Sequence, residues 1–450
     1  MHRLYVERAM ANVGKTSRAW WSVAIVLAVF VVAALYAYAY QVQNGHGVTG
    51  VSHTLFWGFY IVNFVFFIGI SYGGAIISAI LRLTGAKWRA PITRIAEGTA
   101  VVTLAVGAAS VLIDVGRPDR MLNLFLYAQV GSPITWDWIA INTYLVGTLI
   151  FFSLALIPDL AVCRDSFGPA ARGLRGWTYR VLSFGWQGTP EQERALLGGL
   201  KIVAILIIPL AVTVHSVLAW LFAVTVREGW HSTIFAPLFV LGAMLSGVAT
   251  VVLVIAGCRK AYRLQDFITE KHFRYLSYVL LALDAAYVYF VVSEYLTEGY
   301  VQDQAAAGVL GSLLIGGYAP AFWLFAVGGL LVPLVLVALP GRGVVTRACV
   351  ASVLVVAGMW LKRFLIVLLP GAAEGLLPWE LYRPTWVELT ITVGSFAAIP
   401  LGLMALFFFF PVMSIHEMEE VEGTTEAEAV PEPAPAHVPL LPAFAGGGDE

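Results

Sequence analysis

The chain has 450 residues, of which 59% are hydrophobic and 12% charged, and its formal net charge is −1. A mean hydropathy of +0.82 over this length is typical of an integral membrane protein, because a soluble domain has too little interior to bury so many apolar side chains. The balanced charge gives no indication of nucleic-acid binding, so we expect no nucleic-acid partner.

Ten apolar segments are long enough to cross a bilayer as helices, for which about 20 residues are needed. They comprise residues 20–40, 55–81, 95–113, 135–157, 198–222, 232–257, 275–296, 319–339, 344–369 and 387–410. The predicted fold is therefore an all-α integral membrane protein. We expect spans two to five and six to nine to form two four-helix bundles, with the first and last spans beside them. No small-residue cleavage site follows the first span, which we expect to be retained.

The domain boundaries follow from these spans. The predicted units are residues 1–54 (N-terminal segment and first span), 55–222 (first bundle), 223–369 (second bundle), 370–413 (last span) and 414–450 (acidic tail). The tail has no Lys or Arg and alternates Glu with Pro and Ala, a composition typical of a segment that is disordered or lies on a partner. The loop from Asp165 to Ala195 mixes aromatic rings with arginines and predicts a short helix in the membrane interface.

Orientation follows from the Lys and Arg residues of alternate loops. One set of loops, which includes both termini, holds 20 of them, whereas the other set holds Arg117, Arg120, Arg227 and Arg383. Cytoplasmic loops are enriched in Lys and Arg, so both termini are predicted to be cytoplasmic. The loop from Asp114 to Trp138 then faces outward.

That outward loop is the most informative stretch of the sequence. It contains Asp114, Arg117, Asp119, Arg120 and Asp137, and the last of these lies between two tryptophans. Charges beside a bilayer are costly to desolvate and are usually retained for a site or a pathway. The loop is therefore predicted to carry function.

The residues that common cofactors need are scarce. Cys163, Cys258 and Cys349 lie far apart without a CxxC pair, so no iron–sulfur cluster or disulfide framework is expected. Only His215 lies deep within a span, where a haem would need a second histidine at matched depth. A single haem on His215 stays an alternative, but we expect no haem, cluster or metal. The sequence also lacks a P-loop, HExxH and GxSxG.

Protonatable side chains gather in the outer half of the predicted membrane region. They are Tyr72, Asp114, His215, Asp284, Glu294, Lys362 and Arg363. A quinone suits such a place, because its ring enters from the lipid and its two oxygens exchange protons with hydrogen-bonding partners. A structural alternative is open for the acids, since Glu294 or Asp284 could pair with Lys362 or Arg363. A buried core role is likewise open for Tyr72 and His215.

At these residues the chain resembles the NrfD/PsrC family of polysulfide-reductase membrane subunits, and within it the ActC subunit of bacterial alternative complex III. The motifs that carry the resemblance are Gly69–Leu81, Trp88–Glu97, Gly116-Arg-Pro118, Ser132–Asp137, Val214-His-Ser-Val217, Gly229–Pro237, Gly242-Ala243, Ser246-Gly247, Lys271-His272, Glu294, Trp360–Phe364 and Tyr382–Glu388.

The resemblance implies a membrane subunit without a cofactor of its own that binds menaquinone or ubiquinone near the outer face of a bacterial inner membrane. Its implied partners are an extracytoplasmic iron–sulfur or molybdopterin-like subunit, a multihaem cytochrome c subunit and a second related membrane subunit. The chain departs from the ActC pattern at Tyr72 and Asp114, which stand where histidines are usual, and at Leu221, which stands where an aspartate is common.

From the residues and the resemblance together, we expect a subunit that oxidises quinol. Asp114 or His215 would accept quinol protons, Tyr72 would donate a hydrogen bond, and Arg117 would hold Asp114 ionised. A complex that reduces quinone is the closest alternative. A secondary transporter with helices broken at Pro209 and Pro333 is a more distant one.

A route for protons across the membrane is a further hypothesis. Glu97 begins the third span beside Arg94, and Asp114 ends the same span. Glu97, Asp284, Glu294, Lys362 and Arg363 are the candidate members of such a route. The simpler alternative is that Glu97 only pairs with Arg94.

Overall fold

The structure is a computed structural model that describes residues 2–10, 13–53, 55–167, 173–225, 229–230, 232–301, 304–339, 341–372 and 382–420. All regular structure in these residues is helical. Ten helices within them are long and apolar enough to cross a bilayer. The prediction of an all-α membrane protein with ten spans is therefore confirmed.

The spans follow the predicted segments closely. They are α2 (Arg18–Asn44), α3 (Phe59–Leu83), α4 (Ala90–Asp114), α6 (Pro133–Phe167), α8 (Pro190–Ala223), α9 (Phe235–Ala261), α10 (Glu270–Val301), α12 (Ala319–Trp323) continued through a π-helical stretch (Leu324–Leu331) into α13 (Val332–Ala338), α14 (Val344–Ala372) and α15 (Trp386–Phe409). Shorter helices are α1 (His2–Met10), α5 (Asn123–Leu126), α7 (Gly173–Leu182) and α11 (Gln304–Leu314).

Helices α6 and α8 extend beyond their apolar segments. A capping box between Thr189 and Gln192 starts α8 well before the apolar run, because the two side chains satisfy the free N–H groups of the first turn. Pro209 lies inside α8, which continues to Ala223. This proline therefore does not mark the broken helix that a transporter-like site would need.

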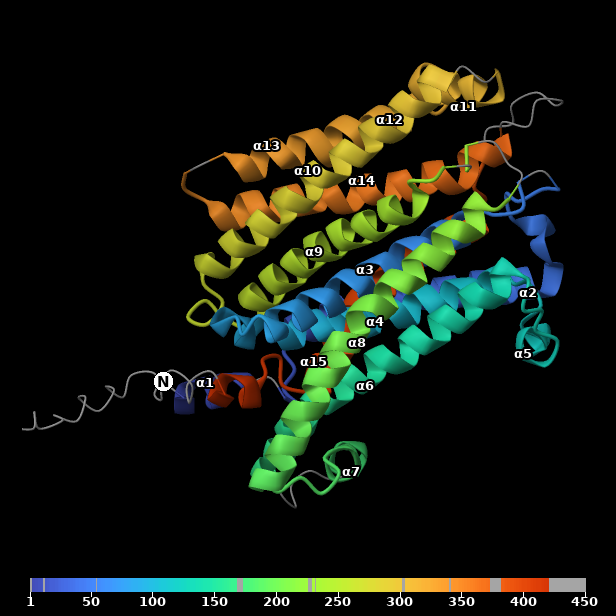
Figure 1. Cartoon of the computed structure of the whole chain (residues 1–450). Coiled ribbons are helices and arrows are strands. Elements are labelled where there is room, and N and C mark those ends of the chain that lie inside the picture. The colour runs from blue at the N-terminus through green and yellow to red at the C-terminus, as the bar shows by residue number, and fades with distance from the viewer. Residues whose placement is uncertain are drawn as a thin grey trace, which may run out of the picture.

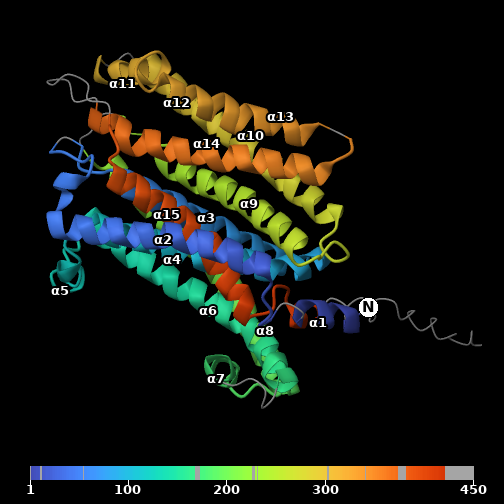
Figure 2. The ribbon, with the colours of Figure 1, turned by 180° about the vertical axis from the view of Figure 1, so that it is seen from behind.

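The helices pack as two bundles. In the first, α3, α4, α6 and α8 contact one another in a closed ring. In the second, α9 contacts α10 and α14, and both α10 and α14 contact the α12–α13 span. Helix α2 packs against α15, and α15 packs against α4, at the flank of the first bundle (Figures 1 and 2).

The two ends of the molecule differ in their short helices. Helices α1 and α7 lie at one end, and α5 and α11 lie at the other (Figure 1). We call the first the basic end, because Arg82, Arg89, Arg175 and Arg347 belong to it. The N-terminal and C-terminal segments meet there, where the Tyr5 hydroxyl donates to the carbonyl of Ser414 at 2.9 Å.

The structure corrects the predicted start of the acidic tail. Residues 414–420 pack against the basic end, and Glu417 is buried in ion pairs with Arg82 and Arg89. Asp159 accepts hydrogen bonds from the backbone N–H groups of Ile415 and His416, each at 3.1 Å. Composition alone does not show these arginine partners. Residues 421–450 lie outside the described part of the chain.

Helix α7 occupies the predicted interfacial loop, with one departure. Trp177 is exposed, as expected for a ring at the headgroup level. Tyr179 is instead buried, and its hydroxyl donates to the carbonyl of Phe409 at 2.7 Å. Contacts to α15 therefore hold this helix on one side.

The two bundles meet where α3 crosses α9. Gly73 and Gly247 are so close that a Cβ atom on either would overlap the backbone of the other. Small residues let membrane helices approach until their backbones touch, and van der Waals packing there drives helix association because lipid offers no hydrophobic driving force. The Tyr72-Gly-Gly and Ser246-Gly sequences supply this contact.

We expect Gly247→Val to destabilise the protein by more than the roughly 1–3 kcal/mol of ordinary overpacking, because the added atoms meet backbone rather than flexible side chains. Thermal unfolding of the purified protein measures this. Gly257→Val is the matched control, since a Cβ at Gly257 of the same helix has nothing within 4 Å. Equal melting temperatures for the two variants would contradict the account of the crossing.

Candidate functional site

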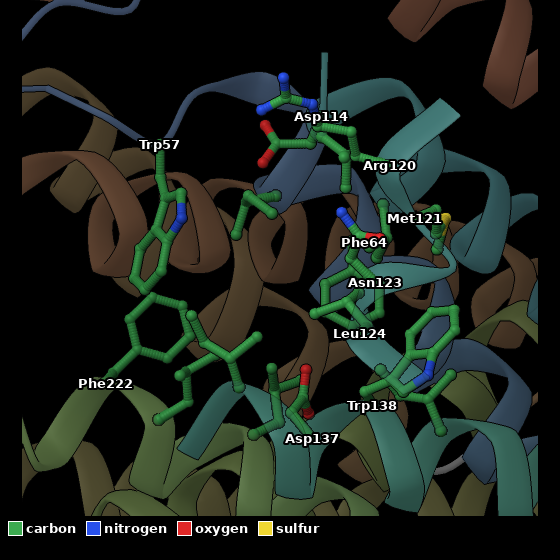
Figure 3. A pocket seen from close by; sticks show the side chains of 17 residues that line it. Trp57, Phe64, Asp114, Arg120, Met121, Asn123, Leu124, Asp137, Trp138 and Phe222 are labelled. Carbon is green, nitrogen blue, oxygen red and sulfur yellow. The ribbon is translucent and has the colours of Figure 1, made fainter. Parts of the chain in front are cut away.

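A cavity of about 430 Å³ lies in the first bundle, at the end opposite the basic end. It is formed by the start of α3, the end of α4, the segment around α5, the start of α6 and the end of α8. Its lining residues are Trp57, Ile61, Phe64, Val111, Asp114, Val115, Arg120, Met121, Asn123, Leu124, Ile134, Asp137, Trp138, Ile141, Leu218, Leu221 and Phe222 (Figure 3). The predicted outward loop therefore forms much of the cavity.

One wall of the cavity is a cluster of aromatic rings. The ring of Trp57 lies 5.0 Å from that of Phe222 and 5.4 Å from that of Trp230, and Phe222 and Trp230 are 5.1 Å apart. The indole N–H of Trp230 donates to the carbonyl of Ile366 at 2.6 Å, which ties this wall to the second bundle. Such rings offer a flat, rigid, apolar surface to a ring-shaped ligand.

Two carboxylates face the cavity from different helices. Asp114 ends α4 and lies near Arg120 at one end of the view, whereas Asp137 lies at the opposite end, near Trp138 (Figure 3). Asp137 is only 8% exposed, and one of its carboxylate oxygens has no hydrogen-bond partner among the described residues. The cavity thus combines an apolar interior with an acid at each end.

Asp137 was not among the predicted site residues, although it lies in the loop that the sequence singled out. The available signal was the Trp-Asp-Trp order at the start of a span, where an acid between membrane-interface rings is unusual. Arg120 was missed for a different reason. The short turn Pro118–Arg120 that aims it at the cavity is not evident from composition.

The expected role of Arg117 is wrong. Its guanidinium donates to both oxygens of Asp119, at 3.0 and 2.8 Å, and this exposed pair keeps the pKa of Asp119 below its ordinary value. Gly116, at φ +67°, turns the chain after α4, so Arg117 does not line the cavity with Asp114. Arg120 is the arginine that lines it.

Tyr72 and His215 lie together, but deeper than the cavity. Their rings are 4.7 Å apart and both side chains are fully buried. His215 precedes the lining residue Leu218 by about one helical turn. The Tyr72 hydroxyl and the His215 Nε2 have no hydrogen-bond partner among the described residues. The predicted site is therefore divided between a cavity with Asp114 and a buried pair below it.

The second bundle contains an ion pair of its own. The Lys362 ammonium lies 3.0 Å from the Glu294 carboxylate and donates to the Tyr295 hydroxyl at 2.7 Å, with Lys362 and Glu294 both buried. The structural alternative for Glu294 and Lys362 is thus the arrangement observed. Neither residue lines the cavity of the first bundle.

Arg363 lies between this ion pair and the first bundle. Its guanidinium is 4.5 Å from the centre of the Phe239 ring and donates to the Phe239 carbonyl at 3.3 Å. Gly242 leaves the space for it, since a Cβ there would lie 2.8 Å from Arg363 Nη2 and 3.0 Å from the Tyr287 ring. Asp284 is also buried, and one of its oxygens has no partner within the described residues.

Glu97 lies at the basic end, far along α4 from Asp114. It accepts a hydrogen bond from Ser78 at 2.8 Å and lies 3.6 Å from Arg94, which also pairs with Asp159 at 2.7 Å. The hydroxyls between Glu97 and Asp114 donate to carbonyls of their own helix. These contacts favour the structural interpretation of Glu97.

Candidate metal ligands do not gather in the described residues: no group of three or more His, Cys, Asp or Glu side chains there could hold a metal ion. Cys163, Cys258 and Cys349 are free thiols. The absence of a haem or cluster in this subunit stays a prediction.

Comparison with known proteins gives one family and several relatives. The family model described as polysulphide reductase, NrfD, matches residues 47–373. A protein from Halobacterium salinarum that is described as a membrane subunit of dimethyl sulfoxide reductase is 30% identical over 90% of this chain and 93% of its own length. A selenate reductase subunit of Mesobacillus selenatarsenatis is 24% identical, over 87% of this chain and 93% of its own. The Hdr-like menaquinol oxidoreductase integral membrane subunit of Archaeoglobus fulgidus is 25% identical, over 88% and 96%.

The ion pair of the second bundle gives a test of its structural role. We expect Glu294→Gln to destabilise the protein by about 3–5 kcal/mol, because it leaves the Lys362 cation buried without its counter-charge. Adding Lys362→Met should restore most of that loss by removing the cation. Thermal unfolding of the single and double variants decides, and additive losses would show that the two side chains do not depend on each other.

Proposed function

The chain belongs to the polysulphide reductase NrfD family, and from that premise we propose that it is the quinol-binding membrane subunit of a multisubunit oxidoreductase complex. The quinol would bind in the cavity between α3, α4, α6 and α8. The relatives support this assignment, because each is named as a subunit of a reductase or oxidoreductase, and one name specifies menaquinol.

The observation that carries the proposal is the pair of acids at opposite ends of an apolar cavity (Figure 3). A hydroquinone has a hydroxyl group at each end of its ring, and its oxidation releases two electrons and two protons. Asp114 would accept the proton from one hydroxyl and Asp137 the proton from the other. The Trp57 and Phe222 rings would hold the quinol ring between them and the α4–α6 side of the cavity.

Arg120 has a positioning role in this proposal. Its positive charge at the Asp114 end of the cavity favours the ionised carboxylate, which is the form that can accept a proton. This is the role that the sequence assigned to Arg117. When Asp114 becomes protonated, the arginine remains available to bind the quinone oxygen.

The two electrons must leave to a cofactor of another subunit. The segment that covers the cavity carries exposed apolar side chains, namely Leu122, Phe125, Leu126, Tyr127 and Val130. Exposed apolar patches of this kind are typical of protein interfaces. We propose that an extracytoplasmic iron–sulfur subunit docks here and passes electrons to a multihaem cytochrome c subunit, as in an alternative complex III-like assembly of a bacterial inner membrane. Purification of the complex through a tag on this chain, followed by identification of its subunits, tests these partners.

The direction of electron flow is part of the proposal. We propose menaquinol oxidation, with electrons moving outward. A complex that reduces quinone would use the same two acids as proton donors, so both directions need the same site. Turnover measured with quinol and with a reduced donor on the purified complex distinguishes them.

A second proposed function is proton translocation through the buried polar side chains between the bundles. The rings of Tyr72 and His215 are 4.7 Å apart, and Arg363 and Tyr287 both border Gly242. Among the described residues, Tyr72, His215, Asp284, Tyr287 and Arg363 each have a buried polar atom without a hydrogen-bond partner. Such groups inside a membrane mark proton or ion routes.

For the quinol site, we expect Asp114→Asn and Asp137→Asn each to lower quinol turnover about 10²-fold, the scale of losing an acid–base group. Asp119→Asn is the matched control, because Asp119 belongs to the same loop but is exposed and paired with Arg117. Steady-state quinol oxidation by the assembled complex measures the effect. If both the Asp114 and the Asp137 variants oxidise quinol at the original rate, the cavity is not the quinol site.

For proton translocation, we expect vesicles containing the complex to take up protons from the side of the basic end while quinol is oxidised. Asp284→Asn should abolish this uptake and leave quinol turnover near its original rate, because Asp284 lies outside the cavity. Asp266→Asn, in the exposed turn between α9 and α10, is the control. If protons only appear on the opposite side and none are taken up, the buried side chains are structural.

A further inference from the structure

A second cavity lies in the other bundle and at the other end of the molecule. It is a groove of about 310 Å³ at the basic end, between the start of α10, the end of α13 and the start of α14. Its lining residues are Arg274, Ser277, Tyr278, Leu336, Val337, Ala338, Leu339, Gly341, Val344, Arg347 and Ala348. The site proposed for quinol shares none of them.

The charge in this groove is all positive. Arg274 and Arg347 line it, and none of the described lining residues is acidic. Arg347 is held in place, because its guanidinium donates to the carbonyl of Gly341 at 2.9 Å and to that of Leu339. Arg274 is exposed, and no ion pair within the described residues engages it. Two guanidinium groups from different helices therefore face one groove.

The rest of the groove is apolar. Leu336, Val337 and Leu339 come from the end of α13, and Val344 and Ala348 come from the first turns of α14. The groove is also located where a membrane surface is expected, since the helix ends that form it carry the excess of basic residues. A ligand must therefore offer an anion to the arginines and apolar chains to this wall.

We propose that the groove binds an anionic phospholipid, with its phosphate between Arg274 and Arg347 and its acyl chains along the α13 and α14 wall. Guanidinium groups bind phosphate oxygens through paired N–H donors, and basic pockets between membrane helices are a common place for such headgroups. The buried hydroxyl of Ser277 is a further donor at the edge of the groove. A free phosphate ion would use the arginines but leave the apolar wall without a partner.

The bound lipid would connect elements that otherwise have little protein around them. The α12–α13 span is one of the least buried of the ten, and it contains the π-helical stretch Leu324–Leu331. A π-helical turn weakens the regular hydrogen-bond ladder. A phosphate held by α10 and α14 at the end of this span would fix its position relative to both neighbours.

The test uses the full chain, purified with its complex and supplied with phosphatidylglycerol, with phosphatidylcholine or with inorganic phosphate. Native mass spectrometry measures retained lipid, and thermal unfolding measures stabilisation. We expect phosphatidylglycerol to be retained and to raise the melting temperature, and the other two additions to do neither. Equal effects of phosphatidylcholine, or of inorganic phosphate alone, would overturn the proposal.

Two variants locate the site. Arg274→Gln should lower the affinity for phosphatidylglycerol about fivefold, the effect of one basic side chain at a membrane surface. Ala338→Phe keeps both arginines but fills the groove at an exposed position, and it should abolish retention. Lys260→Gln removes an exposed charge from the same end outside the groove and should change nothing. The melting temperature of each variant in phosphatidylcholine checks that the variant is folded. If both folded groove variants retain as much phosphatidylglycerol as the original protein, the lipid binds elsewhere.

Discussion

The contact between Gly73 of α3 and Gly247 of α9 is the constraint on which the rest of the structure depends. Backbones can approach this closely only where both helices present glycine at the crossing, and this sets the register of α3 on α9. This register fixes α3 at the centre of the molecule, in contact with α4, α8 and α9. Tyr72 then lies against His215 of α8, and the start of α3 forms a wall of the cavity.

Buried charge is distributed according to the cost of desolvation. Two pairs of opposite charge lie deep in the protein: Arg94 with Asp159, and Lys362 with Glu294. The buried guanidinium of Arg363 instead donates to the Phe239 carbonyl and lies over the Phe239 ring. An isolated ion in a low-dielectric interior would be far more costly than a neutral polar group, so each of these charges is buried together with its partner. The groups that keep a free polar atom, such as Tyr72 and His215, include side chains that can be neutral. These are the groups that can exchange protons or hydrogen bonds without leaving an unpaired ion.

The two proposed ligand sites follow the asymmetry of the bilayer. The cavity with Asp114 and Asp137 lies at the end where few basic residues occur, and it is closed by a segment with exposed apolar side chains suited to a protein partner. The groove with Arg274 and Arg347 lies at the basic end, where anionic headgroups are the natural counter-ions. An acid-lined cavity can take protons from a neutral ring compound, whereas two arginines can hold a phosphate. The two proposed sites therefore lie at opposite ends of the molecule and in different bundles.

The sequence by itself determined the membrane class, the ten spans and the loop that carries the cavity, because hydropathy and turn-forming residues act locally along the chain. It also indicated Asp114. Only the tertiary structure decided which charges meet: Arg117 binds Asp119 while Arg120 reaches the cavity, Asp137 completes it, and Glu417 is buried against Arg82. Residues that are close in sequence, such as Arg117 and Arg120, can point to different partners after one turn of backbone. Side chains more than 300 positions apart, such as Arg82 and Glu417, can form one ion pair. Pairing is set by helix packing in three dimensions, and no local pattern records it.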